Sequence, residues 1–288
     1  MFDIFENNTI MPNTTTNDIY VVSIGGSLLF TNDMPDAEKI KAIAEVISQL
    51  HYSGKKFVIV VGGGKSARLY LDSAKSLGLN NFEQDLLGIL ITKANATLMA
   101  AALPNAWKKV LDDVREAKEI IDEGKIPVFG GLMPLFTTDT VAALIAEYLN
   151  GTFVNLTNVD GIFDSNPKEN PEAKMLTEIS YDKLITIIAK ESSKPGQNVV
   201  LDLPCCMILK RSKIPAVVLN GNNLPNFAAF VRGEQFTGTT IKEIPEETIE
   251  YEEEQKETEK KKKIRKTKTK QTKRKDDYKL PDPYQIDF

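Results

Sequence analysis

The sequence has very little cysteine, histidine or tryptophan. Its 288 residues include two cysteines, one histidine and one tryptophan. Cys205 and Cys206 are adjacent. We interpret them as reduced thiols packed in a helix, because neighbouring cysteines rarely bridge one another and two alone do not make a metal site. His51 follows an apolar helical stretch and is interpreted as structural. This inventory gives no recognisable hydrolytic triad.

Long hydrophobic runs are also missing. No segment reaches the ~18 consecutive apolar residues of a membrane span. The first 18 residues are rich in Asn and Thr and lack the basic and then apolar pattern of a signal peptide. We therefore expect a flexible N-terminal extension over residues 1–18 and a cytoplasmic protein with no membrane partner. The formal net charge of -4 indicates that the molecule as a whole is not built to hold nucleic acid.

Charge separates sharply near the C-terminus. Residues 246–259 hold eight Glu and one Lys, whereas residues 260–275 hold eleven Lys or Arg and no acidic residue. Almost nothing apolar accompanies either block, so residues 244–288 are expected to form a disordered tail. The basic block 260–275 is a candidate for weak, salt-dependent polyanion binding, and a simply solvated tail is the alternative.

Between residues 19 and 243, strand patterns alternate with helix patterns. Apolar runs predict strands at 19–24, 56–61, 107–110, 126–129, 152–156, 216–219 and 238–241. Apolar residues at helical spacing predict helices at 35–50, 66–77, 82–103, 112–123, 140–148, 181–189, 203–211 and 224–231. This alternation favours a single α/β domain over residues 19–243, with a parallel sheet covered on both faces.

Three of the predicted strands end in runs of glycine: Gly25-Gly26, Gly62-Gly63-Gly64 and Gly130-Gly131. Glycine lets a bound group approach the backbone, and the helix that follows offers unpaired N–H groups. In open α/β sheets, ligands bind at the carboxyl ends of the strands. We therefore predict anion sites for more than one phosphate-bearing ligand. A tight turn without a ligand is the alternative, although one glycine would be enough for it.

Several polar residues accompany these turns. Lys65 and Arg68 follow the glycine triplet, and Lys93 is a third candidate cation for stabilising phosphoryl transfer. The apolar helix at 82–103 also carries Asp85 and Asn95, which must face either solvent or a site. Asp139 precedes the next helix and is predicted to be its N-cap.

Together these motifs resemble the amino acid kinase superfamily and, within it, the archaeal-type uridylate (UMP) kinases. The matching segments, in the order of that family, are residues 24–27, 60–68, 85–89 with 92–96, 127–131 with 137–139, 157–161 and 210–214. The resemblance implies a three-layer α/β/α sandwich with a mainly parallel central sheet, assembled as a homohexamer. It also implies UMP bound toward the N-terminal part and ATP with Mg²⁺ toward the C-terminal part.

The resemblance further implies which residues form the site. Asp160 would organise the metal or neighbouring lysines, Arg68 would hold phosphate charge, and Asp85 would bind the ribose hydroxyls of UMP. The implied UMP-binding residues are Gly63, Asp85, Leu132, Met133, Pro134, Leu135, Phe136, Thr137 and Thr138. The implied ATP-binding residues are Gly26, Ser27, Gly64, Arg68, Thr157, Asn158, Phe163 and Asn166. No residue is implied as a direct metal ligand.

The sequence departs from the pattern of the family at five positions of the motifs. In the ATP loop, Phe163 stands where tyrosine is usual and Asn166 where aspartate is usual. Ser23 stands where many members have a lysine, and Lys65 is our candidate for the replacement cation. Leu135 follows Pro134 where the family has glycine, and Phe136 takes a polar position. Three hypotheses follow: a UMP kinase of pyrimidine biosynthesis, a related kinase for another small phosphate or carboxylate acceptor, and a non-catalytic nucleotide-binding or storage homologue. The two bulky residues favour the second.

Overall fold

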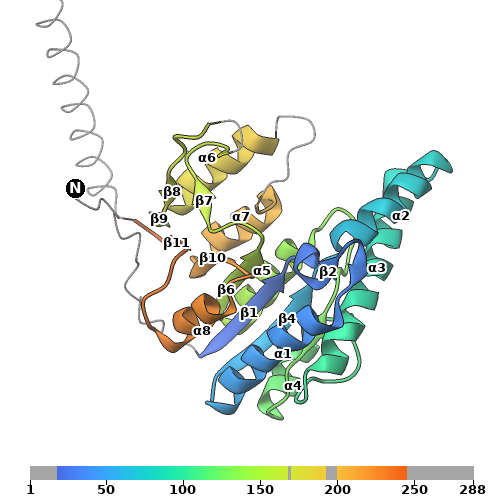
Figure 1. The fold of residues 1–288 in the computed structure, drawn as a ribbon, viewed down its shortest axis with the longest axis horizontal. Coiled ribbons are helices and arrows are strands. Elements are labelled where there is room, and N and C mark those ends of the chain that lie inside the picture. Colours follow the sequence, from blue (N-terminus) through green and yellow to red (C-terminus); the bar gives the residue numbers. More distant parts are fainter. Residues whose placement is uncertain (1–17, 168–169, 193–199, 245–288) are drawn as a thin grey trace, which may run out of the picture. The chain divides into compact units, whose positions relative to one another are not determined.

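The computed structural model describes residues 18–167, 170–192 and 200–244. Its centre is a seven-stranded sheet of order β5-β4-β1-β6-β10-β11-β9 (Figure 1). The first five strands in that order are parallel to one another, and β11 runs antiparallel to β10. The strands are β1 (Ile19–Ile24), β4 (Lys56–Val61), β5 (Val128–Phe129), β6 (Thr152–Thr157), β9 (Glu178–Ile179), β10 (Ala216–Asn220) and β11 (Thr239–Ile241). The prediction of a mainly parallel sheet is confirmed.

Helices cover both faces of this sheet, because successive strand residues point to opposite sides. In β1, Val22 belongs to the core under α1 (Ala37–Tyr52), α3 (Asn81–Ala102) and α8 (Leu224–Arg232). Val21 belongs to the opposite core, under α4 (Glu116–Asp122), α5 (Thr138–Leu149), α6 (Tyr181–Ser192) and α7 (Leu203–Arg211). Helix α2 (Gly64–Ser76) packs on α3. The result is the three-layer α/β/α sandwich.

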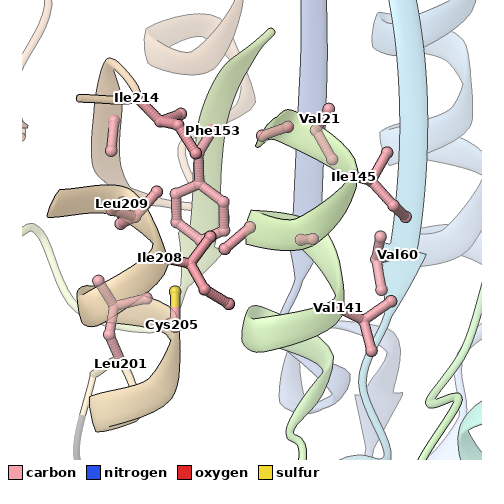
Figure 2. Close-up of a cluster of buried hydrophobic side chains, with 14 of the residues drawn as sticks. Val21, Val60, Val141, Ile145, Phe153, Leu201, Cys205, Ile208, Leu209 and Ile214 are labelled. Carbon is pink, nitrogen blue, oxygen red and sulfur yellow. The ribbon is translucent and has the colours of Figure 1, made fainter. Parts of the chain in front are cut away.

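The core between the sheet and α5 and α7 explains the two cysteines. Phe153 of β6 is fully buried there among side chains from both helices (Figure 2). Cys205 and Cys206 are unbridged and fully buried in α7, as predicted. Burial raises the pKa of the Cys206 thiol to about 12, so this side chain behaves as a small apolar group.

Short elements connect the main ones. They are η1, a 3₁₀ turn at Gly26–Leu29, the hairpin of β2 (Phe30–Thr31) and β3 (Met34–Pro35), and the hairpin of β7 (Ile162–Phe163) and β8 (Met175–Leu176). His51, at the end of α1, lies within hydrogen-bond distance of the carbonyls of Lys55 and Gly124, which agrees with a structural role.

The segment between α3 and β5 differs from the prediction. Residues 107–110 form no named strand; single parallel bridges pair Ala106 with Ile126 and Leu111 with Phe129 instead. The helix predicted from residue 112 begins at Glu116. The Asp113 carboxylate accepts hydrogen bonds from the backbone N–H and the side chain of Arg115, and such local bonding competes with a helix. The predictions for residues 1–17 and for the tail from residue 245 lie outside the described residues.

Candidate functional site

The glycine turns after β1 and β4 pack directly against each other. A Cβ atom on Gly26 would lie 2.1 Å from the backbone nitrogen of Gly64, and one on Gly62 would lie 2.9 Å from the nitrogen of Gly26. Gly64 also has a φ of 67°, in the left-handed region that favours glycine. Only glycine permits this approach of two backbones, which explains why both strands end in runs of it.

A pocket of about 490 Å³ opens where these turns meet. Its wall includes the first turns of α2 and α5, the start of η1, and the loop after β5. The residues that line it are Gly25, Gly26, Ser27, Gly62, Gly63, Gly64, Ala67, Arg68, Leu71, Asp85, Gly88, Ile89, Thr92, Gly131, Met133, Leu135, Phe136, Thr137, Thr138, Asp139, Asn155, Thr157 and Val200. The predicted convergence of the glycine turns on one cleft is therefore present.

Backbone amides dominate the anion-binding capacity of the pocket. Helix α2 begins at Gly64, and its N-cap residue, Gly63, has no side chain to cap the first-turn N–H groups. At this point of the pocket wall, these N–H groups and the positive end of the helix dipole are available to bind an anion. Arg68 lies one turn further along and is the cation among the lining residues. This arrangement favours phosphate oxygens.

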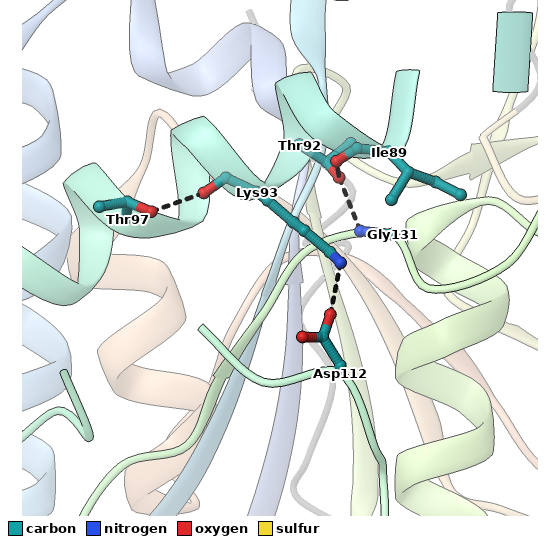
Figure 3. A network of polar contacts seen from close by, with 6 residues as sticks. All are labelled: Ile89, Thr92, Lys93, Thr97, Asp112 and Gly131. Atoms are coloured by element: carbon teal, nitrogen blue, oxygen red, sulfur yellow. Dashed lines mark hydrogen bonds and ion pairs between the residues drawn. The ribbon is translucent and has the colours of Figure 1, made fainter. Parts of the chain in front are cut away.

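Helix α3 holds the glycine turns after β4 and β5 in place. The buried Asn95 side chain donates to the carbonyls of Gly62 (2.9 Å) and Gly63 (3.1 Å). One turn earlier, Thr92 Oγ1 accepts a hydrogen bond of 2.7 Å from the backbone N–H of Gly131 (Figure 3). The two side chains lie three residues apart and so share one helix face. From the sequence, Asn95 could face either solvent or a site. The sequence did not identify Thr92 as a positioning residue.

Two of the predicted cations lie outside the pocket lining. The Lys93 side chain extends to Asp112 and forms an ion pair with it (Figure 3). Lys65 lies 2.6 Å from the carboxylate of Asp33, and both side chains are about half exposed. An exposed pair of this kind is weak and salt-screened. The role of Lys65 as the replacement cation stays a prediction.

The loop after Gly131 carries a strained residue. Leu135 has a φ of 75°, a conformation that costs a non-glycine residue roughly 1–2 kcal/mol, and it is 80% exposed. Its N–H donates a hydrogen bond of 2.8 Å to Oδ2 of Asp85 on α3. The chain thus keeps at Leu135 the backbone that a glycine would adopt. Leu135 belongs to the pocket wall, and its high exposure shows that it does not fill the pocket.

Helix α5 begins earlier than predicted, and its cap is a different residue. Thr137 is the N-cap, and its side chain accepts from the N–H of Thr140. The prediction that Asp139 is the cap is wrong, because the extended backbone that a cap needs occurs at Thr137 (φ -74°, ψ 170°). Asp139 lies inside the first turn instead, and its side chain faces the pocket.

The hydrogen bonds of Asp139 come from neutral groups. Ser23 Oγ donates to Oδ1 at 2.6 Å, and the amide of Asn155 donates to the same oxygen at 3.4 Å. Burial raises the pKa of the Asp139 carboxyl to about 7; the Ser23 hydrogen bond opposes this rise, and the negative charge of Asp202 adds to it. A carboxyl group whose pKa lies near neutrality in the wall of a pocket is a functional candidate.

The predicted ATP residues are only partly in the wall of this pocket. Gly26, Ser27, Gly64, Arg68 and Thr157 line it. Asn158, Phe163 and Asn166 are not among the lining residues, and neither are Leu132 and Pro134 from the UMP set or Asp160, to which the resemblance gives a catalytic role. The exposed Asp160 carboxylate accepts a hydrogen bond of 2.8 Å from the Asn220 amide at the end of β10. Their proposed roles in nucleotide binding stay predictions.

Comparisons with known proteins agree with this architecture. The model of the amino acid kinase family matches residues 18–220. A uridylate kinase of Thermococcus kodakarensis is 42% identical over 224 residues, which cover 77% of this chain and 98% of the relative. A uridylate kinase of Archaeoglobus fulgidus is 40% identical over 222 residues, with the same coverage of both chains. The crystal structure of uridylate kinase from Archaeoglobus fulgidus has a TM-score of 0.69 and covers 77% of this chain and 99% of its own.

Proposed function

The chain belongs to the amino acid kinase family, and from this premise we propose that it is a uridylate kinase, which transfers the γ-phosphoryl group of ATP to UMP. The observation that carries the proposal is the single pocket on which the glycine turns after β1 and β4 converge with the first turns of α2 and α5. About 40% identity to archaeal uridylate kinases over most of the chain supports the choice of UMP as the acceptor.

The proposed reaction asks little covalent chemistry of the protein. A phosphate oxygen of UMP attacks the γ-phosphorus of ATP, the bond from that phosphorus to the β,γ-bridging oxygen breaks, and UDP and ADP result. In the transition state, negative charge is spread over the equatorial oxygens of the transferred group and builds up on the leaving oxygen of ADP. The backbone N–H groups of the turns and Arg68 stabilise this charge. The rest of the catalytic effect comes from holding both phosphates in line, a task for the rigid strand ends of β1 and β4.

Mg²⁺ enters the proposal as part of the substrate, MgATP. No cluster of three His, Cys, Asp or Glu side chains suited to a metal occurs in the part of the chain that the structure describes. Mg²⁺ is commonly held by substrate phosphates, one or two carboxylates and water, so a dedicated protein cage is not required. We expect turnover to stop on chelation with EDTA and to return with added MgCl₂.

The test of the function is ADP release from MgATP with a panel of acceptors: UMP, CMP, AMP and small organic phosphates. Turnover with UMP far above the others is the expected result. Turnover with a non-nucleotide acceptor would favour the second hypothesis, for which Leu135 and Phe136 at the pocket wall are the motivating residues. Tight ATP binding without turnover on any acceptor would favour a non-catalytic homologue.

Asp85→Asn should weaken the binding of UMP far more than the binding of ATP. In the proposed site, the Asp85 carboxylate accepts hydrogen bonds from the ribose diol of UMP, and hydrogen bonds to a charged group contribute roughly 1.5–3 kcal/mol. We therefore expect KM for UMP to rise by about 10- to 100-fold while KM for MgATP stays within about twofold. The asparagine oxygen can still accept from the N–H of Leu135, so the loop conformation is preserved. An equal loss for both nucleotides would contradict the assigned role.

We also propose that the protein assembles through the exposed face of α3. Phe82, Leu86, Leu90 and Leu98 are all more than 40% exposed on this helix. Helix α3 is long and apolar enough to span a membrane by composition, but it packs on α1, α2 and two strands of the sheet. We therefore interpret the apolar stripe as an interface of a cytoplasmic homo-oligomer. Phe82 and Leu98 lie eight residues to either side of Leu90, so the stripe can pair with a second copy in antiparallel fashion.

Leu90→Glu should dissociate this assembly. The side chain is 62% exposed, so the change leaves the core of the subunit intact while placing a charge at the centre of the stripe. Size-exclusion chromatography with light scattering should show a smaller species than the wild type. Gln49→Glu, at an exposed position of α1, adds the same charge away from the stripe and should leave the mass unchanged. An unchanged mass for Leu90→Glu would refute the interface.

A further inference from the structure

The first turn of α7 is joined to the first turn of α5 by Asp202. Oδ1 of Asp202 accepts a hydrogen bond of 2.7 Å from Thr137 Oγ1, and Oδ2 accepts one of 2.5 Å from Thr140 Oγ1. Thr137 is the N-cap of α5, and Thr140 is fully buried one turn later. The two carboxylate oxygens therefore hold both ends of the turn whose residues face the pocket.

The local structure shows that this connection is made in place of a helix cap. Asp202 occupies the N-cap position of α7, where an Asp side chain normally accepts from the N–H groups of its own helix. Its side chain makes no such bond. Both oxygens instead reach α5, a different element, 62 and 65 residues away along the chain. The carboxylate contributes to the placement of α5 more directly than to the stability of α7.

The neighbours of Asp202 belong to the pocket as well. Val200, two residues earlier, lines the pocket, and its carbonyl accepts a hydrogen bond of 3.2 Å from Asn155 of β6. Asn155 also donates to Asp139, which lies between Thr137 and Thr140 in the sequence. The start of α7, Asn155 of β6 and the start of α5 thus form one polar junction beside the glycine turns.

We propose that Asp202 is a positioning residue for phosphoryl transfer, which fixes the N-terminal turn of α5 against the acceptor phosphate through the hydroxyls of Thr137 and Thr140. This inference rests on the proposed function, because it assigns that turn to the acceptor. The positive end of α5 and the side chains of Thr137 and Thr138 act only where the turn is held. A displacement of about 1 Å in such a group can lower a rate by roughly a hundredfold.

The test uses two matched pairs of variants in the full chain, assayed with UMP and MgATP. Asp202→Ala removes both acceptors, and Asp202→Asn keeps the shape while one amide oxygen and one amide donor replace the two acceptors. Thr140→Val keeps the buried shape and loses the hydroxyl, whereas Thr140→Ser keeps the hydroxyl and loses a methyl group. For Asp202→Ala we expect KM for UMP to rise and kcat to fall by about tenfold each, with KM for MgATP within about twofold of the wild type.

The Thr140 pair separates hydrogen bonding from packing. We expect Thr140→Val to change KM for UMP and kcat in the same direction as Asp202→Ala, Thr140→Ser to stay near the wild type, and Asp202→Asn to fall between Asp202→Ala and the wild type. Adding Thr140→Val to Asp202→Ala should change the constants little further, because the shared bond is already lost. A loss in Thr140→Ser equal to that in Thr140→Val would overturn the proposal, because it would indicate packing alone.

Two outcomes distinguish this inference from the proposed function. A wild-type enzyme that does not phosphorylate UMP contradicts the function itself. The positioning role is contradicted if the wild type phosphorylates UMP and Asp202→Ala has unchanged KM values for both substrates. In that case the variant would differ from the wild type only in having a smaller fraction of active molecules. If Asp202→Ala does not fold, the comparison of Thr140→Val with Thr140→Ser tests the same positioning role.

Discussion

Gly26→Ala is expected to abolish turnover. The new Cβ would lie 2.1 Å from the nitrogen and 2.6 Å from the Cα of Gly64, and 2.7 Å from the carbonyl oxygen of Gly62. All three atoms belong to the backbone, so no side-chain rotation relieves the overlap. The turns after β1 and β4 must separate, and the N–H groups that they aim at the phosphates separate with them. We expect kcat/KM to fall by at least about a hundredfold.

Gly88→Ala is the matched control for this prediction. Gly88 lines the same pocket from α3, but a Cβ there would meet only the Leu71 side chain, at the ordinary contact distance of 3.8 Å. Alanine also favours a helix interior over glycine by roughly 1 kcal/mol, so this variant should fold at least as well as the wild type. We expect turnover within about threefold of the wild type. Wild-type activity in Gly26→Ala would show that the two turns do not form the phosphate site.

The sequence was sufficient to predict a mainly parallel sheet and the convergence of its glycine turns on one pocket. Strand and helix periodicities alternate clearly in this chain, and an alternating chain has few ways to bury its strands other than a covered parallel sheet. The carboxyl ends of parallel strands share one edge, so glycines after β1 and β4 had to come close. The contact between Gly26 and Gly64 is a consequence of this topology.

The polar contacts of the site were less predictable, because they depend on residues far apart in sequence. Lys93 was a reasonable candidate cation until its ion pair with Asp112 was known, and nothing in the sequence identifies that partner. Asn95 holds two carbonyls of the glycine triplet more than thirty residues away. Helical spacing from Thr92 places both on one face, but it does not tell which face meets the turns.

The start of α5 shows a second limit of prediction. Thr137, Asp139 and Thr140 are all residue types that can stand at a helix start, and only the backbone conformation selects Thr137 as the cap. A shift of two residues moved Asp139 from a surface cap into the pocket. Leu135 is a related case, because a leucine gives no local sign of a positive φ. Only the resemblance, which implies a glycine at this position, anticipates the conformation.

The position of Asp139 inside the first turn of α5 leads to the second prediction with a large effect: the stability of the protein should depend on pH. The folded-state pKa of this carboxyl is raised from 3.8 to about 7, mainly by burial. The native state therefore binds a proton more tightly than the unfolded state. The resulting stabilisation is full below about pH 4 and is lost as the pH rises through 7. At about 1.4 kcal/mol per pKa unit, the total change is at most about 4 kcal/mol.

Asp139→Asn should remove this dependence. Asparagine keeps the shape of the side chain and carries no charge. The free energy of unfolding of the variant minus that of the wild type should therefore be larger at pH 8 than at pH 5. Denaturant titrations of both proteins at the two pH values measure the difference, and the comparison cancels the titration of the other carboxyl groups. A difference that stays the same between pH 5 and pH 8 would show that Asp139 is ionised throughout and that its pKa is not raised.

The same carboxyl should couple nucleotide binding to proton uptake. Phosphates placed beside Asp139 add negative charge, which raises its pKa further, and its hydrogen-bond partners, Ser23 and Asn155, are neutral. Titration calorimetry of UMP binding near pH 7.5, in buffers of different ionisation enthalpy, should show more proton uptake by the wild type than by Asp139→Asn. Net proton release by the wild type relative to the variant would mean that the ligand brings a cation to the carboxylate, and Asp139 would then act in its ionised form.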